Sequence, residues 1–344
     1  MLPRIAQVVV CVGLVGCGFS AKPADTTGGT VDAASPGGGS DVGSGSDAGR
    51  GSGSDAGVAT KTCMQVWMDG TVQLGTPAPL TNQSNSDVIE RDPWVSMDGK
   101  RLYYATDRIT GPGTSDIAVA TRPNTQAAFG TGAVDVNLST GTNDESRPSL
   151  TLDEKIIVIA SNRSGGGSPN GQFNILYNAT GTPNMFGTPD MNHMSTVDQT
   201  QVDHFDPFLS PDGLRLYFAP VIAGQRIYLA SRGQLNDDFS GAAAVPIING
   251  ANGSHDADPA LSADEKIILF TSDRGGNNDL YFATRPDKAQ QFSSPKPVPG
   301  VNGTSLDGDP FLSFDGCTLY FASNRLTGNL NYDLFSATVT NGVP

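Results

Sequence analysis

Several residue types are scarce in this chain. Aromatic residues make up 7% of its 344 residues, and it has only three histidines and four cysteines. Lysine and arginine number 21 against 35 aspartates and glutamates, which gives a formal net charge of −14. This charge argues against nucleic acid and against anionic membrane surfaces as partners. An acidic surface instead favours solubility and contact with cations or with basic patches of other proteins.

Catalytic and helical signals are also missing. The sequence contains neither a nucleophile elbow nor a His-Glu-x-x-His pair, and no segment has the apolar periodicity of a helix. The glycines at 165–167 and 275–276 do not precede a helix, which excludes a phosphate-binding loop. We therefore expect no cofactor.

The N-terminus reads as an export signal over residues 1–16. Its apolar run, Ile5 to Val15, is too short to span a bilayer and ends at a small residue followed by Cys17. The segment LVGC at 14–17 resembles the bacterial lipobox. That resemblance implies cleavage before Cys17 and a lipid on its sulfur, and Gly18 in place of aspartate favours the outer membrane. An ordinary signal peptide with an incidental cysteine stays open.

Residues 17–60 are predicted to be a flexible tether. They are rich in glycine, serine and aspartate, and GSGSDAG occurs twice. Such a stretch has too little apolar surface to fold. The lipid on Cys17 would thus be the only link between the membrane and a globular domain at 61–344.

That domain contains five copies of one pattern. The copies are DPWVSMDGKRLYYATDR from 92, RPSLTLDEKIIVIASNR from 147, DPFLSPDGLRLYFAP from 206, DPALSADEKIILFTSDR from 258 and DPFLSFDGCTLYFASNR from 309. Units of about 50 residues that recur this way bury their apolar faces only against their neighbours. The repeat therefore identifies an architecture rather than an activity.

Each copy reads as short antiparallel strands. In the fourth copy these are residues 260–262, 267–272, 279–284 and a proline-rich outer strand at 296–301. The sequence predicts an all-β, five-bladed β-propeller of four-stranded antiparallel blades. The fifth copy lacks its outer strand, and residues 71–80 resemble that strand. We expect the N-terminus to close the ring.

The segment SPDGLRLYF at 210–218, followed in other copies by Ser-Asp-Arg and a glycine-rich loop, resembles the WD40-like repeat of TolB-type β-propellers. The resemblance covers about residues 64–341. It implies a periplasmic propeller that binds other envelope proteins.

Acidic residues recur two positions before the inner-strand proline motif in four copies, and a histidine stands there in the third. If the inner strands line a central channel, these positions form a ring at one mouth, a candidate site for a cation or a basic ligand group: Glu90, Glu145, His204, Asp256 and Asp307. The alternative is turn capping. His204 and His255, with Asp203 and Asp256, are a weaker candidate for a divalent metal, and we expect no metal site.

The aspartate before the inner-strand proline is missing only in blade two, where Arg147 stands, and the arginine that ends the second strand is missing only in blade three. These adjacent losses predict pairs between neighbouring blades. The pairs would be Asp92 with Arg163, Asp206 with Arg274, Asp258 with Arg325 and Asp309 with Arg108. The alternative is that each arginine serves its own blade.

In an exported and oxidising context, Cys63 and Cys317 are the remaining cysteines. Alternating strand direction places both near one face of the last blade, so we expect a disulfide that fastens the ring closure.

Three functions remain open. The first is a monomeric module that binds an envelope protein or a glycan. The second is a polysaccharide hydrolase or lyase that uses carboxylates at the channel mouth, since a glycosidase needs two carboxyls about 5–10 Å apart. The third is a structural lipoprotein without a ligand.

Overall fold

The computed structural model describes residues 60–84, 88–108, 114–163, 171–197, 202–221, 224–250, 254–326 and 331–344. The predicted signal, Cys17 and residues 18–59 lie outside these ranges, so their roles remain predictions. Within the described ranges, no helix combines the length and the apolar character needed to cross a membrane.

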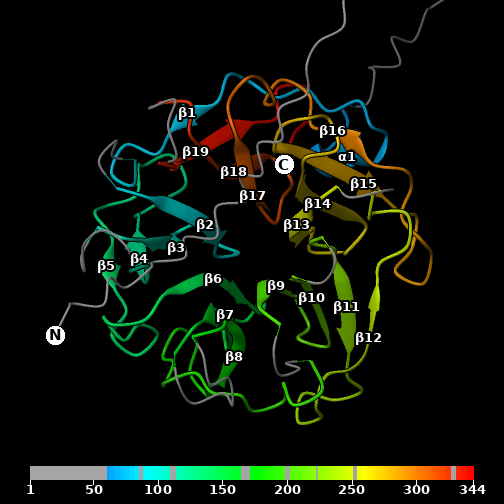
Figure 1. Ribbon diagram of the computed structural model, residues 1–344. Coiled ribbons are helices and arrows are strands. Elements are labelled where there is room, and N and C mark those ends of the chain that lie inside the picture. Colours follow the sequence, from blue (N-terminus) through cyan, green and yellow to red (C-terminus); the bar gives the residue numbers. More distant parts are fainter. Residues whose placement is uncertain are drawn as a thin grey trace, which may run out of the picture. The chain divides into compact units, whose positions relative to one another are not determined.

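Antiparallel sheets stand around a central axis, which confirms the predicted five-bladed propeller (Figure 1). Blade one is β2 to β5, blade two β6 to β8, blade three β9 to β12, blade four β13 to β16, and blade five β17 to β19 with β1. The strands are β1 (Ala78–Pro79), β2 (Glu90–Val95), β3 (Arg101–Thr106), β4 (Asp116–Thr121), β5 (Ala133–Val134), β6 (Glu145–Leu150), β7 (Ile156–Ser161), β8 (Asn174–Ala179), β9 (His204–Leu209), β10 (Arg215–Pro220), β11 (Tyr228–Ser231), β12 (Ser240–Ala244), β13 (Asp256–Leu261), β14 (Ile267–Ser272), β15 (Asp279–Thr284), β16 (Lys296–Pro297), β17 (Asp307–Leu312), β18 (Thr318–Ser323) and β19 (Asp333–Thr338).

The second strand of each blade carries most of the core. Every residue of β7 and of β14 is buried, because these strands are covered on both faces by the neighbouring blades. Their β-branched and apolar sequences, IIVIAS and IILFTS, suit this position. β14 and β15 have the bounds that the sequence predicts, whereas the first strand begins earlier than expected, at Asp256.

Three of the outer strands, β1, β5 and β16, are only two residues long. β16 covers only Lys296–Pro297 of the predicted 296–301, because proline cannot donate to a strand ladder. Blade two has three strands, and a single antiparallel bridge between Tyr177 and Asp190 takes the place of the fourth.

The N-terminal segment closes the ring, as predicted. β1 pairs with β19 through Ala78 opposite Ser336 and Pro79 opposite Phe335. An isolated bridge between Leu74 and Val339 extends this pairing. The last blade is therefore built from both ends of the domain, which leaves no open sheet at the junction.

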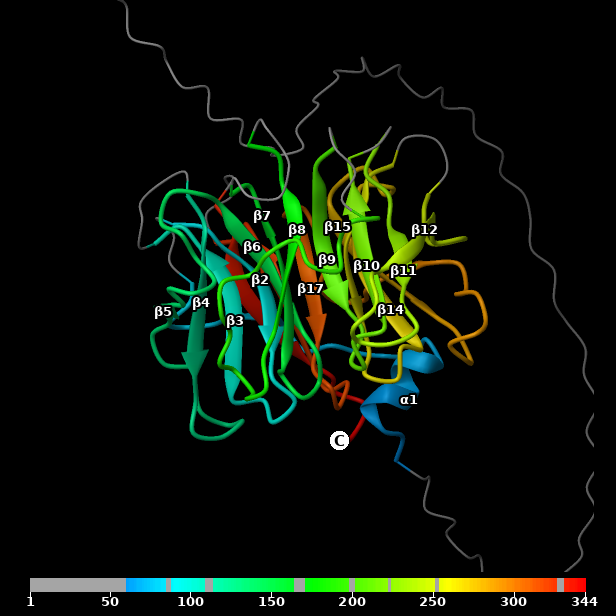
Figure 2. The same ribbon diagram turned by 90° about the horizontal axis from the view of Figure 1, so that it is seen from below.

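One short helix, α1 (Cys63–Met68), departs from the all-strand expectation. Thr62 and Gln65 form a capping box at its start, a Thr-x-x-Gln signal that is legible in the sequence. Six residues are too few for apolar periodicity, so the periodicity criterion could not detect it. α1 lies at one end of the strands, close to the C-terminus (Figure 2).

Candidate functional site

Five equivalent residues meet at the centre of the propeller. We call them the central ring: Asp92, Arg147, Asp206, Asp258 and Asp309. Each precedes a proline, and each has a positive φ, between 51° and 58°. The register of each inner strand shifts next to this residue, which marks a β-bulge. Aspartate tolerates the left-handed conformation better than most residues, which suits four of the five positions.

Arg147 of β6 is the hub of the central ring. Its Nε lies 2.5 Å from Oδ1 of Asp206, and its Nη1 lies 3.1 Å from Oδ1 of Asp92 and 2.9 Å from Oδ1 of Asp309. The same Nη1 contacts Asp258. A single guanidinium therefore forms ion pairs with one carboxylate from each of the other four blades.

Backbone amides link the ring residues in sequence around the axis. The N–H of Arg147 donates to Oδ2 of Asp92 at 3.1 Å, and the N–H of Asp258 donates to Oδ2 of Asp206 at 3.3 Å. The N–H of Asp309 likewise donates to Oδ2 of Asp258 at 3.4 Å. Each of these aspartates thus bonds to the next blade, but to its backbone and not to an arginine of its second strand.

The space left at the centre is small. The central ring, its prolines and the apolar residues beside them enclose about 40 Å³. A buried water occupies roughly 10–15 Å³ on this measure, so the cavity has room for a few waters and not for a sugar ring.

Four carboxylates share one guanidinium at the axis. Burial and the charges of the neighbours shift the pKa values of Arg147 and of three of these aspartates. Burial opposes the charge on Arg147, but the four carboxylates outweigh it and raise the pKa of Arg147 well above its usual value. Burial raises the pKa of Asp206 well above its usual value, and burial with repulsion from Asp92 and Asp258 does the same for Asp309. Burial opposes ionisation of Asp258 too, but Arg147 and Thr271 lower its pKa. Asp206 and Asp309 therefore bind a proton more tightly than isolated carboxylates do, whereas Asp258 binds one less tightly.

The predicted ion pairs between blades are wrong. The arginines pair within their own blades: Arg108 with Glu90 at 2.5 Å, Arg163 with Glu145 at 3.1 Å, Arg274 with Asp256 at 2.5 Å and Arg325 with Asp307 at 2.6 Å. Asp92, Asp206, Asp258 and Asp309 instead bind Arg147. The physical reason is the bulge, which places these aspartates at the axis around the guanidinium of Arg147, and Arg91 also approaches Asp92 at 3.8 Å.

The proposed open ring of Glu90, Glu145, Asp256 and Asp307 is also corrected. All four carboxylate side chains are fully buried and bound by arginine, so they do not face a ligand at the mouth. Burial raises the pKa of Glu145 and of Asp307. His204 occupies the equivalent position in blade three, where the sequence has Ile222 in place of the arginine. The acid and the arginine are thus lost together, in one blade.

The histidines do not assemble a metal site. Burial lowers the pKa of His204, whereas His255 is exposed and contacts Asp273 at 2.8 Å. Across the described ranges, no group of three or more His, Cys, Asp or Glu side chains is arranged to hold a metal ion.

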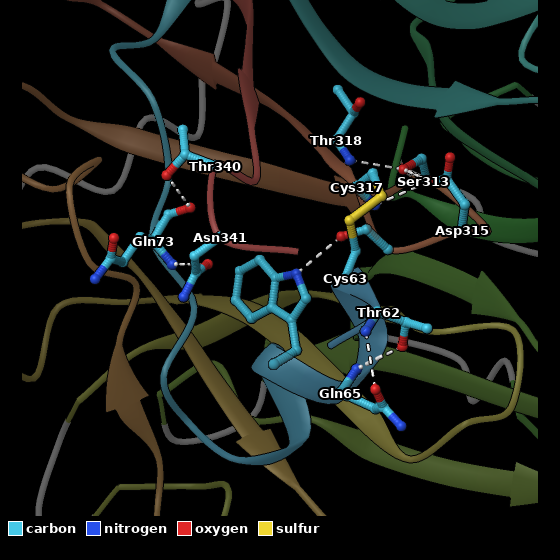
Figure 3. Close-up of a disulfide and its surroundings, with 12 residues drawn as sticks. Thr62, Cys63, Gln65, Gln73, Ser313, Asp315, Cys317, Thr318, Thr340 and Asn341 are labelled. Atoms are coloured by element: carbon cyan, nitrogen blue, oxygen red, sulfur yellow. Dashed lines mark hydrogen bonds between the residues drawn. A yellow bond between two sulfur atoms is a disulfide. The ribbon is translucent and has the colours of Figure 1, made fainter. Parts of the chain in front are cut away.

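Cys63 and Cys317 form a disulfide with a Cα–Cα distance of 5.1 Å (Figure 3). It joins α1 to the turn between β17 and β18. The indole N–H of Trp67 donates to the carbonyl of Gly316 in the same turn at 3.0 Å. The N-terminal segment is therefore attached to blade five by a covalent bond, a buried hydrogen bond and the β1–β19 pairing.

Comparison with known proteins supports the propeller fold. No protein-family model matches the chain, and no curated protein does. Among solved structures, a protein described as a glycoside hydrolase is 11% identical over 82% of this chain and 96% of its own chain, with a TM-score of 0.54. The α-L-arabinofuranosidase PaAbf62A from Podospora anserina is 12% identical over 79% and 98%, with a TM-score of 0.51. TolB from Acinetobacter baumannii is 18% identical over 72% and 52%, with a TM-score of 0.43. At these identities the likeness concerns the propeller alone.

Proposed function

We propose that the chain is a binding module of the cell envelope, held there by a lipid on Cys17, whose propeller recognises an envelope protein or a glycan. The observation that supports this most is the position of Arg147. Its guanidinium occupies the axis and is bound to four aspartates, where a catalytic propeller would need room for substrate.

A hydrolase is the second candidate, favoured by the fold shared with the glycoside hydrolase and the arabinofuranosidase. Glycoside hydrolysis needs two carboxyls on either side of a sugar, one of them free to donate a proton. In this chain the axial cavity measures about 40 Å³. The four aspartates around it share the guanidinium of Arg147, which argues against that chemistry. A purely structural lipoprotein is the third candidate.

Two assays on the full chain test this proposal together. The first is a glycan array with a pull-down from solubilised envelope, and the second is a hydrolysis screen on plant and microbial polysaccharides. We expect retention of a glycan or of an envelope protein without release of sugar. Sugar release that survives purification would overturn the proposal in favour of the hydrolase, and no retention of any kind would favour the structural role.

The anchor is tested separately by Cys17→Ala. We expect the native chain to fractionate with membranes and the variant to move to the soluble fraction after export. A variant that stays in the membrane fraction would contradict the lipid anchor and leave the binding role of the propeller intact.

A further inference from the structure

The residues that face the interfaces between neighbouring blades alternate around the ring. The alternation begins in the turn after the inner strand. Blades one, three and five carry Asp-Gly in this turn, and blades two and four carry Asp-Glu. The first residue of the second strand alternates with it: Arg101, Ile156, Arg215, Ile267 and Thr318. Alternation around a ring fails at one junction when the number of units is odd, and here that junction lies between blades five and one.

Ion pairs fill two of the interfaces. Arg101 of blade one donates to Glu154 of blade two through Nε at 2.8 Å and Nη2 at 2.6 Å. Arg215 of blade three makes the same bidentate contact with Glu265 of blade four, with both bonds at 2.5 Å. These forks occupy the space between the turns.

Apolar groups fill two others. Between blades two and three, Ile156 and Leu235 lie against Gly213, within 3.4 Å of the point where a Cβ would stand. Between blades four and five, α1 covers the corresponding Gly316 with Met64, and Trp67 packs on Phe282 at a ring distance of 5.2 Å.

At the fifth interface, small residues stand at the three positions that fill the other gaps. Thr318 stands where the other blades have arginine or isoleucine, Gly99 stands opposite, and Thr125 occupies the position of Leu235. A cavity of about 290 Å³ lies here. We call it the closure pocket. Its volume is close to the lower end of the roughly 300–1,000 Å³ typical of small-ligand sites.

The walls of the closure pocket present donors and acceptors together. The exposed carboxylates of Asp98 and Asp315 come from the turns of blades one and five. Each uses Oδ1 to hold its own turn, accepting from the hydroxyl of Ser96 or Ser313 at 2.6 Å. The second carboxylate oxygen of each has no role in the turn, so it is available to a ligand.

A cation and an aromatic ring complete the lining. Arg122 of blade one donates from Nη2 to the hydroxyl of Tyr320 of blade five at 3.2 Å. Burial raises the pKa of Tyr320, so its hydroxyl stays protonated and can donate in turn. Phe314 and Leu80 supply apolar surface, and Phe314 is partly exposed.

One wall is held rigidly by the ring closure. Phe314 and Asp315 lie in the turn that the Cys63–Cys317 disulfide attaches to α1 (Figure 3). The backbone N–H of Cys317 donates to Oδ1 of Asp315 at 2.9 Å. A wall fixed before binding reduces the entropy lost when a ligand is held.

We propose that the closure pocket binds one neutral sugar residue of a glycan. This deepens the binding role proposed above and rests on it. A sugar hydroxyl both donates and accepts, which matches carboxylates and a tyrosine hydroxyl placed beside a guanidinium. A sugar ring also has an apolar face for Phe314. An anion would be repelled by Asp98 and Asp315, and a cation would be repelled by Arg122, which also lines the pocket.

Filling the closure pocket tests the proposal. The double variant Thr318→Ile with Thr125→Leu copies the isoleucine and leucine that fill the interface between blades two and three. We expect it to fold, as checked by circular dichroism and thermal melting, and to bind neutral oligosaccharides at least tenfold more weakly. Thr182→Ile with Thr188→Leu makes the same exchanges on the exposed surface of blade two and is the matched control.

A second variant covers the case in which the filled chain does not fold. Asp98→Asn keeps the Oδ1 acceptor of the turn but removes a charge from the closure pocket, and we expect weaker sugar binding with only a small loss of stability, because the pKa of Asp98 is lowered in the fold. The probes are gluco-, xylo-, manno- and arabino-oligosaccharides, measured by array and calorimetry with the full chain.

The outcomes separate this inference from the proposed function. Equal sugar binding by the native, filled and Asp98→Asn chains would overturn the closure pocket and leave the binding role standing. Capture of an envelope protein without any sugar binding would overturn the sugar class alone. Release of sugar from a polysaccharide by the native chain would overturn the proposed function itself.

Discussion

Nε of Arg147 lies 2.5 Å from Oδ1 of Asp206, so that blade two supplies the cation and blade three one of its four anions at the axis of the propeller. The side chain of Asp206 is fully buried and that of Arg147 is 20% exposed. A charged pair in this position is expensive to disrupt from one side, because the remaining charges stay buried. Arg147 thus stabilises the centre of the propeller and also fills much of the space at its axis.

We expect Arg147→Leu to lower the free energy of unfolding by about 3–5 kcal/mol at pH 7, the usual cost of breaking a buried ion pair. The four carboxylates would remain without a cation. The loss should shrink towards pH 4, because carboxylates whose pKa is raised in the folded state take up protons there. Urea unfolding at both pH values measures this.

Arg147→Lys is the matched control. It keeps the charge but not the planar fork, so its cost should lie between those of the native chain and of Arg147→Leu. A loss for Arg147→Leu that is the same at pH 4 and pH 7 would contradict an electrostatic role and point to lost packing.

Neutralising Asp309 and neutralising Asp258 should change the stability of the fold in opposite directions. The pKa of Asp309 is raised well above its usual value, first by burial and then by repulsion from Asp92 and Asp258. Its contribution to stability is present below the unfolded pKa of about 3.9 and is lost as pH rises through the folded pKa. Asp309→Asn should therefore stabilise the chain at pH 7, with the gain vanishing near pH 4.

Asp258→Asn is the opposing case. Arg147 and Thr271 outweigh burial and lower the pKa of Asp258, so the ionised form contributes stability above the unfolded pKa. The asparagine variant should unfold at lower urea than the native chain at pH 7. Thermal or urea midpoints that shift in the same direction for both variants would rule out the proposed distribution of charge.

The pair of Asp256 and Arg274 allows a double-mutant cycle. Arg274→Ile leaves a fully buried carboxylate without its cation and should cost about 3–5 kcal/mol. Adding Asp256→His reproduces the residues that blade three has at these positions, His204 and Ile222, and should recover part of the loss. We expect a coupling energy above about 1 kcal/mol from urea unfolding. Additive effects would mean that the two losses in blade three are unrelated.

Removing the disulfide should destabilise the closure. Cys63→Ser with Cys317→Ser opens a loop with a sequence separation of 254 residues, which the chain-entropy model values at roughly 5.5 kcal/mol. The pairing of β1 with β19 should then exchange its amide hydrogens faster than the inner strands do. Unchanged exchange at Leu80, whose N–H donates to Leu334 at 2.8 Å, would show that the strands alone hold the ring.

Much of the fold follows from the sequence. Five copies of one pattern specify five blades, and the missing outer strand of the last copy specifies that residues 71–80 complete it. These inferences succeed because a strand is a local object and a blade must bury its faces against its neighbours. The partners of Glu90 and Asp256 were equally legible, since each arginine follows its acid by 18 residues and the pair is lost together in blade three.

What only the tertiary structure decided is where the repeated side chains converge. The bulge at each Asp-Pro turns Asp92 and its equivalents to the axis, and no local pattern indicates that one arginine, Arg147, would meet four of them there. The closure pocket has the same origin. The residues Thr318, Gly99 and Thr125 are unremarkable along the chain, and they leave a cavity because ring closure places them together at the one interface where the alternation fails. Sequence spacing fixes which residues a strand presents, whereas contacts between strands far apart in the chain depend on the geometry of the closed ring.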